Sequence, residues 1–406
     1  MKFFNNYKKI FIFTNGCTRR KLDVKRLETY FRLNNCKITR KLKEADYIIF
    51  VSCAFVKQRI EESLQIIMKL KKYNGELIIV GCLPEINRKS LNEIFNGKTI
   101  STKNLDEIDK IFPEFKFKFS TIPDANLISS SFSGVSLIIG TKKAKIFSQN
   151  CLNLIKNIFI ETTKSRFLSS QQFTYFLRIQ KGCLGSCSYC SIRKAIGPLK
   201  SKPLAVCIEE YKQMINKRYK NFVILGDDVG AYGLDIKSTF PELLWSLSKI
   251  SQGNTTIWSI KELHPKWIVK YESDLLKLVE QNKIKHMLCG IQSGSDRILR
   301  LMNRYHNSNN IIRILKKFKE VNPDLKLSAQ IIIGFPSETR EDFLATLASI
   351  KKIKFNEVFM YPFSKNEKTP AASLRDEISD TIKRKRIKQA MKVLKKEKIK
   401  FFCEDV

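Results

Sequence analysis

The sequence predicts an α/β protein: an N-terminal Rossmann-like parallel-sheet domain, then a partial (βα)6 barrel, and finally a basic C-terminal helix. Three observations predict this fold. In the first hundred residues, three short aliphatic runs alternate with helix-like stretches. From Phe173 onward, six further runs repeat the alternation. The segment from Thr381 to Lys400 combines apolar residues at roughly helical spacing with ten Lys or Arg. Short runs that are apolar on both faces are typical of strands in a buried parallel sheet.

The N-terminal domain is predicted from its βαβ pattern. The runs Ile10–Phe13, Tyr47–Val51 and Leu77–Val80 are the expected strands, and residues 21–33 and 57–72 are the expected helices. The intervals between successive runs are long enough for one helical crossover each. The strands should therefore pair in parallel, with their carboxyl ends at one edge of the sheet.

A cysteine follows each of these three runs. They are Cys17, Cys53 and Cys82, separated by 36 and 29 residues. Ligands of parallel sheets gather beyond the carboxyl ends of the strands, so the repeated placement predicts that the three thiols converge on one metal site. The alternative is three buried structural cysteines, which is the role we expect for Cys36 and Cys151, because a free Cys is often a small core residue.

The hydrophobic periodicity weakens between about Phe112 and Gln172, where we expect a connection with a candidate strand at Val135–Ile139 and assign it no function. Alternation then resumes, and the carboxyl ends of the barrel strands should carry functional residues. The expected barrel strands are Thr174–Ile179, Asn221–Leu225, Thr256–Ile260, His286–Ile291, Leu327–Ile333 and Glu357–Tyr361. The predicted domains are 1–115, 116–172, 173–375 and 376–406.

One short loop after the first barrel strand carries three cysteines in the spacing C-x3-C-x2-C. They are Cys183, Cys187 and Cys190. Such a loop can present three thiolates to one iron–sulfur cube, whereas an ordinary [4Fe–4S] centre has four Cys ligands. One iron then stays free to bind a small molecule, much as a catalytic zinc keeps an open position. The alternatives are a zinc site or part of an electron-transfer cluster. Zinc sites favour a fourth Cys or His close by, yet the nearest outside cysteines are Cys151 and Cys207.

This loop resembles that of the radical S-adenosylmethionine (SAM) superfamily. The resemblance implies that the open iron chelates SAM and that an electron from the cluster splits it to a 5′-deoxyadenosyl radical. Together with the three dispersed N-terminal cysteines, the loop resembles the radical SAM methylthiotransferases, which hold an auxiliary [4Fe–4S] cluster at strand ends. The implied metal ligands are Cys17, Cys53, Cys82, Cys183, Cys187 and Cys190.

Further stretches resemble this family. Leu225–Gly233 resembles Leu-Gly-Gln-Asn-Val-x-x-Tyr-Gly, although Asp227 and Asp228 stand where the family carries amides. These carboxylates could accept from the SAM amino group or mark a different substrate, and the alternative is a solvated turn. Ile291–Leu299 resembles Val-Gln-Ser-Gly-Ser-Asp-x-x-Leu, and Ile331–Thr339 resembles a Gly-Phe-Pro-Gly-Glu-Thr motif. No catalytic residue is implied beyond the cluster ligands. The implied cofactor-binding residues are Tyr189, Gly226, Asp227, Gln292, Ser293, Ile333 and Gly334.

The composition predicts a polyanionic partner. Lys plus Arg number 74 against 39 Asp plus Glu, a formal net charge of +35, which favours RNA through phosphate neutralisation. The alternative is a generally basic, Lys- and Asn-rich proteome. Eleven cysteines without a signal-like start predict a reducing, cytoplasmic location and metal ligation. No apolar run approaches the roughly 18 residues of a membrane span, so no membrane partner is expected.

The basic segment Thr381–Lys400 predicts an amphipathic helix that contacts phosphate or only packs its apolar stripe on the barrel. The family normally continues into a β-rich TRAM module, which we expect to be lacking here.

The resemblance implies a radical SAM methylthiotransferase that uses two [4Fe–4S] clusters and SAM, with an electron donor such as flavodoxin or ferredoxin. The first expected substrate is a tRNA adenosine near the anticodon, and the second is a protein or ribosomally made peptide. Two further hypotheses stay open: a different radical SAM sulfur insertion, and an RNA-binding protein with structural clusters.

Overall fold

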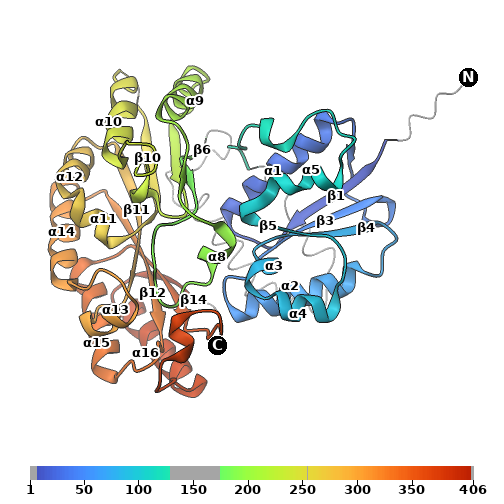
Figure 1. Ribbon diagram of the computed structural model, residues 1–406. Helices are drawn as coiled ribbons and strands as arrows, with labels where there is room; N and C mark the ends of the chain where they lie inside the picture. Colours follow the sequence, from blue (N-terminus) through green and yellow to red (C-terminus); the bar gives the residue numbers. More distant parts are fainter. Residues whose placement is uncertain (1–6, 129–173, 254, 404–406) are drawn as a thin grey trace, which may run out of the picture. The chain divides into compact units, whose positions relative to one another are not determined.

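The computed structural model describes residues 7–128, 174–253 and 255–403 (Figure 1). The candidate strand at Val135–Ile139, Cys151 and most of the expected connection 116–172 lie outside these ranges. The chain divides into two units. The N-terminal unit comprises Met1–Ile158 with Ser191–Gly197, and the C-terminal unit comprises Phe159–Cys190 with Pro198–Val406.

The N-terminal unit is built on a five-stranded, all-parallel sheet in the order β2-β1-β3-β4-β5. Its strands are β1 (Lys9–Thr14), β2 (Lys37–Ile38), β3 (Tyr47–Ser52), β4 (Glu76–Gly81) and β5 (Thr99–Ser101). Its helices include α1 (Thr18–Leu33), α2 (Lys57–Leu70), α3 (Leu83–Ile86), α4 (Arg88–Ile94), α5 (Ile108–Ile111) and α8 (Ile192–Ile196). The three strands and two helices expected from the sequence are confirmed.

Alternate residues of the central strands enter two separate cores, because successive side chains of a strand point to opposite faces. Phe50 packs under α2, α3 and α4, whereas Ile49 packs under α1 and α5. Figure 1 shows these two helix layers on either side of the sheet. Both faces are thus buried, which explains why the strands are continuously apolar.

The C-terminal unit contains a seven-stranded parallel sheet whose order, β6-β9-β10-β11-β12-β13-β14, follows the chain. Its strands are β6 (Thr174–Arg178), β9 (Asn221–Leu225), β10 (Ile257–Leu263), β11 (Ile284–Gln292), β12 (Lys326–Ile333), β13 (Glu357–Pro362) and β14 (Lys400–Cys403). Its helices are α9 (Leu204–Asn216), α10 (Phe240–Ile250), α11 (Pro265–Lys270), α12 (Glu272–Glu280), α13 (Asp296–Leu301), α14 (Ser308–Val321), α15 (Arg340–Ile353) and α16 (Asp380–Lys396). A short antiparallel pair joins β7 (Gln180–Lys181) to β8 (Lys200–Ser201). The predicted α/β class with parallel sheets is confirmed.

The basic C-terminal segment is part of the sheet architecture. Ile387, Ala390 and Leu394 of α16 enter the core of the C-terminal unit. The chain then returns as β14, which pairs in parallel with β13 at the edge of the sheet. This seventh strand is not among the strands predicted from the sequence. In the described parts of the chain, no helix combines the length and apolar character that crossing a membrane requires.

Candidate cluster and cofactor sites

The loop that carries Cys183, Cys187 and Cys190 is held on several sides within the C-terminal unit. The β7–β8 ladder closes its base. The N–H of Gly182 donates to Asp227 Oδ2 at 2.8 Å. The N–H of Ser188 donates to the backbone carbonyl of Met302 at 3.0 Å, and its own carbonyl accepts from the N–H of Ala371 at 2.8 Å. These hydrogen bonds fix the backbone of the cysteine loop, although the loop has no regular secondary structure.

Two of the three loop sulfurs lie over Gly185. A Cβ added at that glycine would stand 3.1 Å from Cys183 Sγ and 3.8 Å from Cys187 Sγ. The N–H of Gly185 also donates to Cys183 Sγ at 3.1 Å. Burial raises the pKa of the Cys183 thiol to about 12, and the nearby Asp228, Cys190 and Cys187 add to the rise.

The three thiols of this loop are a donor set that fits an iron–sulfur cube. No three His, Cys, Asp or Glu of the described residues are close enough to hold one metal ion. The three ligands of a cube bind three different irons, so their sulfurs lie farther apart than ligands that share an ion. An all-thiolate set also suits soft iron–sulfur chemistry. Because the pKa of Cys183 is high, loading the site must release its proton.

A residue that the sequence analysis missed stands beside this loop. The guanidinium of Arg304, after α13, donates from Nη1 to Cys187 Sγ at 3.2 Å and to the Tyr189 hydroxyl at 3.1 Å. Its Nη2 donates to the carbonyl of Gly290. A fixed cation stabilises a neighbouring thiolate, and it can also receive a carboxylate. The sequence signal that could have pointed to Arg304 is its position shortly after the family-like stretch Ile291–Leu299.

Gln180 is a second missed residue. This residue is 2% exposed, yet neither its amide oxygen nor its amide nitrogen has a hydrogen-bond partner in the described part of the chain. It lies against Gly226, where an added Cβ would stand 2.8 Å from Gln180 Nε2. A buried amide without partners in a native fold calls for a physical explanation, and a bound small molecule beside the cluster loop would supply one.

The two aspartates after β9 have different environments. Asp227 accepts from the cluster loop at Gly182. Asp228 is 3% exposed and accepts from Trp267 Nε1 at 2.9 and 3.0 Å. Burial raises the pKa of Asp228. The interpretation of this pair as a solvated turn is therefore wrong for Asp228.

His264 has a structural role in α11. Its Nδ1 accepts from the N–H of Lys266 at 3.1 Å and so caps the helix. Burial, together with the charges of Arg304 and Lys266, lowers the pKa of His264 to about 2. The ring is therefore neutral at physiological pH and acts as a helix cap.

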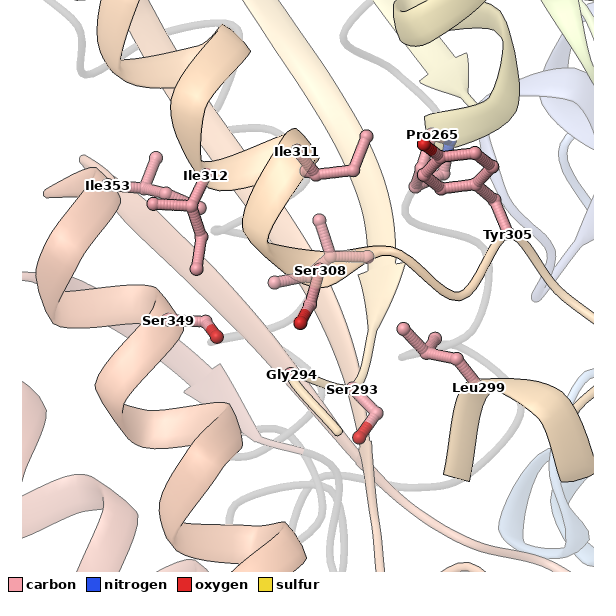
Figure 2. Close-up of a pocket in the computed structure, with 11 residues that line it drawn as sticks. Pro265, Ser293, Gly294, Leu299, Tyr305, Ser308, Ile311, Ile312, Ser349 and Ile353 are labelled. Atoms are coloured by element: carbon pink, nitrogen blue, oxygen red, sulfur yellow. The ribbon is translucent and has the colours of Figure 1, made fainter. Parts of the chain in front are cut away.

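Gln292 and Ser293 stand at the carboxyl end of β11. Gln292 has a left-handed backbone at φ 63°, which costs roughly 1–3 kcal/mol in a non-glycine residue and is typical of ligand sites. The Ser293 hydroxyl contacts Thr346 Oγ1 at 3.2 Å. Ser293 and Gly294 also line a small, mainly apolar cavity with residues of α14 and α15 (Figure 2). None of the six predicted cysteine ligands lines that cavity.

Ile333 and Gly334 end β12 and begin a loop braced by α16. The N–H of Gly334 donates to Glu338 Oε2 at 2.9 Å. Arg386 donates from Nη1 to the same Glu338 oxygen and from Nη2 to the Glu338 carbonyl at 3.0 Å. Burial raises the pKa of Glu338 to about 7, against the opposing effects of Gly334 N–H and Arg386. The loop is thus tied to a helix that follows it by more than forty residues.

The three N-terminal cysteines occupy one edge of their sheet. Cys17 is the N-cap residue of α1, Cys53 follows β3, and Cys82 follows β4. Burial raises the pKa of Cys53, the nearby Cys82 and Cys17 add to the rise, and Arg59 opposes it. The three thiols therefore lie close enough to interact electrostatically, and this donor set also fits a cube.

Local hydrogen bonds position Cys53. Asn15 accepts from the N–H of Cys53 at 2.9 Å and donates to Ser63 Oγ at 3.0 Å. The Ser63 hydroxyl donates to the Cys53 carbonyl at 2.7 Å. Cys82 Sγ contacts Thr102 Oγ1 at 3.7 Å. The loops after β1 and β3 are thereby linked to the middle of α2.

Each cysteine of this edge is followed by a helix with an ion pair, which the sequence analysis also missed. Arg20 pairs with Asp23 at 3.1 Å on α1, and Arg59 pairs with Glu62 at 2.8 Å on α2. On α3, Glu85 pairs with Lys103 at 3.2 Å. Of these cations, Arg59 lowers the pKa of Cys53 and so favours its anionic, metal-binding form.

Two family models match the chain. The Radical SAM superfamily model covers residues 177–350, and the model called Uncharacterized protein family UPF0004 covers residues 9–101. The ribosomal protein uS12 methylthiotransferase RimO of Citrifermentans bemidjiense is 27% identical over 391 residues, which is 95% of this chain and 81% of that protein. The threonylcarbamoyladenosine tRNA methylthiotransferase MtaB of Thermotoga maritima is 27% identical, over 84% of this chain and 72% of that protein.

The chain belongs to the radical SAM methylthiotransferase family. It is therefore an enzyme of this class. Among solved structures, the radical SAM methyltransferase TsrM of Kitasatospora setae aligns with a TM-score of 0.59 at 10% identity, over 90% of this chain and 77% of that one. At this identity the likeness concerns the fold alone. Family membership implies SAM and a [4Fe–4S] cluster as cofactors of this methylthiotransferase.

Proposed function

We propose that this methylthiotransferase uses two [4Fe–4S] clusters and acts on a tRNA adenosine near the anticodon. One cluster would be held by Cys183, Cys187 and Cys190, and the other by Cys17, Cys53 and Cys82. The observation that carries the two-cluster proposal is that each unit has its own cysteine triad at the carboxyl side of a parallel sheet. When bound, the clusters and SAM supply the electron, the carbon radical and the sulfur.

The residues of the C-terminal unit would bind and orient SAM beside the cluster loop. The amide of Gln180 offers a donor and an acceptor without partners in the described residues. The guanidinium cation of Arg304 lies next to Cys187 and could bind the SAM carboxylate. We retain Tyr189, Gly226, Asp227, Gln292, Ser293, Ile333 and Gly334 as proposed cofactor-binding residues. Because Ser293 already bonds to Thr346, its hydroxyl would act mainly by fixing the β11 end.

The net charge of +35 supports an RNA substrate. MtaB, named as a tRNA methylthiotransferase, aligns at 27% identity. A protein substrate is the second candidate, because several relatives at the same identity are named ribosomal protein uS12 methylthiotransferase. An electron donor such as flavodoxin or ferredoxin would reduce the cluster in either case.

Iron and sulfide analysis of anaerobically reconstituted protein tests the two-cluster proposal. Wild type should contain about eight irons, and a Cys183→Ala, Cys187→Ala, Cys190→Ala variant about four. Four irons in wild type falling to none in the variant would overturn the proposal of a second cluster.

The substrate is tested with SAM carrying a deuterated methyl group, reductant, and either tRNA or ribosomal protein. Labelled methylthio product in tRNA nucleosides supports the first candidate, and label in the protein supports the second.

A further inference from the structure

The outer face of α16 carries a row of lysines that no other described helix matches. Lys385, Lys388, Lys392, Lys395 and Lys396 are all exposed. Their spacing, mostly three or four residues, places them along one side of the helix, over about 17 Å. Neighbouring charges are therefore about 5 Å apart along the axis, which is of the same order as neighbouring phosphates on a nucleic-acid strand.

Among the described residues, no acidic side chain forms an ion pair with any lysine of this row. Between Asp380 and Glu397 the helix contains no acidic residue. Asp380 pairs with Lys383, and Glu397 pairs with Lys351 of α15. The exposed face of α2, by contrast, mixes the two signs, as with Lys57 and Glu61. A general excess of lysine in the chain does not by itself create such a segregated face.

The inner face holds the helix in place. Ile387, Ala390 and Leu394 lie in the core, and Arg386 donates twice to Glu338. The row is thus part of an ordered helix, so binding a partner does not include the free-energy cost of ordering that helix. The apolar face is already buried and could not enter a lipid surface, as an interfacial helix requires.

We propose that the row Lys385, Lys388, Lys392, Lys395 and Lys396 on α16 is a docking surface for RNA phosphates. A linear array of cations on an ordered helix, whose apolar residues face the core and not the outer side, complements a phosphate backbone. Docking here would position RNA without reading its sequence, since phosphate contacts carry no base information. The choice of tRNA as the RNA rests on the proposed function, whereas the docking of RNA phosphates on α16 does not.

The test compares reconstituted wild type with a variant in which these five lysines are changed to Gln. Binding of fluorescent tRNA is followed by anisotropy between 50 and 300 mM salt. The five-residue variant should bind at least about tenfold more weakly at low salt, and its slope of log K against log salt should be flatter by about 4. A matched control changes Lys212, Lys217, Lys277, Lys316 and Lys317 to Gln, which removes the same charge from exposed positions in or next to α9, α12 and α14. The control should stay within about twofold of wild type.

The proposal is overturned if the α16 variant keeps the wild-type affinity and slope, or if both variants weaken equally. It is also overturned if wild type binds acidic protein or anionic vesicles but no tRNA. Uncoupled formation of 5′-deoxyadenosine should be unchanged in the α16 variant, which reports an intact fold and radical site. The proposal that tRNA is modified fails separately. In that case, wild type binds RNA through α16 but forms no labelled methylthio product.

Discussion

Arg304 Nη1 donates a hydrogen bond to Cys187 Sγ at 3.2 Å, although 117 residues separate the two in the chain. The same guanidinium contacts the Tyr189 hydroxyl and the Gly290 carbonyl. It therefore connects the cluster loop to the end of β11, where the proposed SAM-binding residue Gln292 stands. Hydrogen bonds to ligating sulfurs are a main determinant of iron–sulfur potentials.

Replacing Arg304 by Gln should lower the reduction potential of the cluster on Cys183, Cys187 and Cys190. The cation stabilises the more negative, reduced state, and a loss of about 1.4 kcal/mol corresponds to about 59 mV for a one-electron couple. An EPR-monitored redox titration in a Cys17→Ala, Cys53→Ala, Cys82→Ala background isolates this cluster. Arg304→Lys should recover part of the shift, and an unchanged potential in Arg304→Gln would contradict the assigned role.

Replacing Gln180 by Leu should weaken SAM binding without destabilising the protein. The buried amide has no partner to lose in the described residues, whereas a hydrogen bond to bound SAM is worth about 1 kcal/mol, or roughly fivefold in affinity. Equilibrium dialysis with SAM and thermal unfolding measure the two quantities on the same preparations. A lowered melting temperature with unchanged SAM affinity would show that Gln180 is structural.

Glu338 should make the protein less stable as the pH rises. Its pKa is raised from 4.5 to about 7 in the folded state, by burial first and with Asp342 adding, so the folded state binds the proton more tightly than the unfolded state. Its stabilising contribution is complete below pH 4.5 and is lost as the pH rises through 7. The change amounts to about 3 kcal/mol.

Chemical unfolding of wild type and Glu338→Gln between pH 4.5 and 8 checks this prediction. The free energy of unfolding of wild type should fall relative to that of the Gln variant across this range. A parallel course of the two curves would mean that Arg386 keeps the carboxylate ionised throughout. Subtracting the two curves removes titrations that both proteins share.

The two cysteine triads should have separable roles. Changing Cys17, Cys53 and Cys82 to Ala should preserve 5′-deoxyadenosine formation from SAM and abolish methylthio transfer. Changing Cys183, Cys187 and Cys190 to Ala should abolish both. Chromatography of 5′-deoxyadenosine and mass spectrometry of the labelled substrate give the two readouts. Loss of SAM cleavage in the first variant, with the fold intact by circular dichroism, would refute this division of labour.

Local patterns made much of this protein predictable. The runs at β1, β3 and β4 are apolar on both faces, and only strands covered by helices on both sides have that pattern. The loop with Cys183, Cys187 and Cys190 stands out for a similar reason, because three cysteines within eight residues need no long-range information to be proposed as a ligand set. The strand β14 escaped prediction because its four residues become a strand only through pairing with β13.

The sequence by itself determined the parallel α/β architecture and the resemblance to methylthiotransferases, and it singled out two sets of cysteines as candidate ligands, because each depends on residues a few positions apart or on a repeated period. The tertiary structure decided which side chains surround those cysteines. Arg304 reaches Cys187, Gln180 faces Gly226, and Arg386 braces Glu338 only because strands and helices distant in the chain are packed together. Hydrogen bonds and ion pairs act over a few ångströms of space, whereas sequence patterns record only distance along the chain.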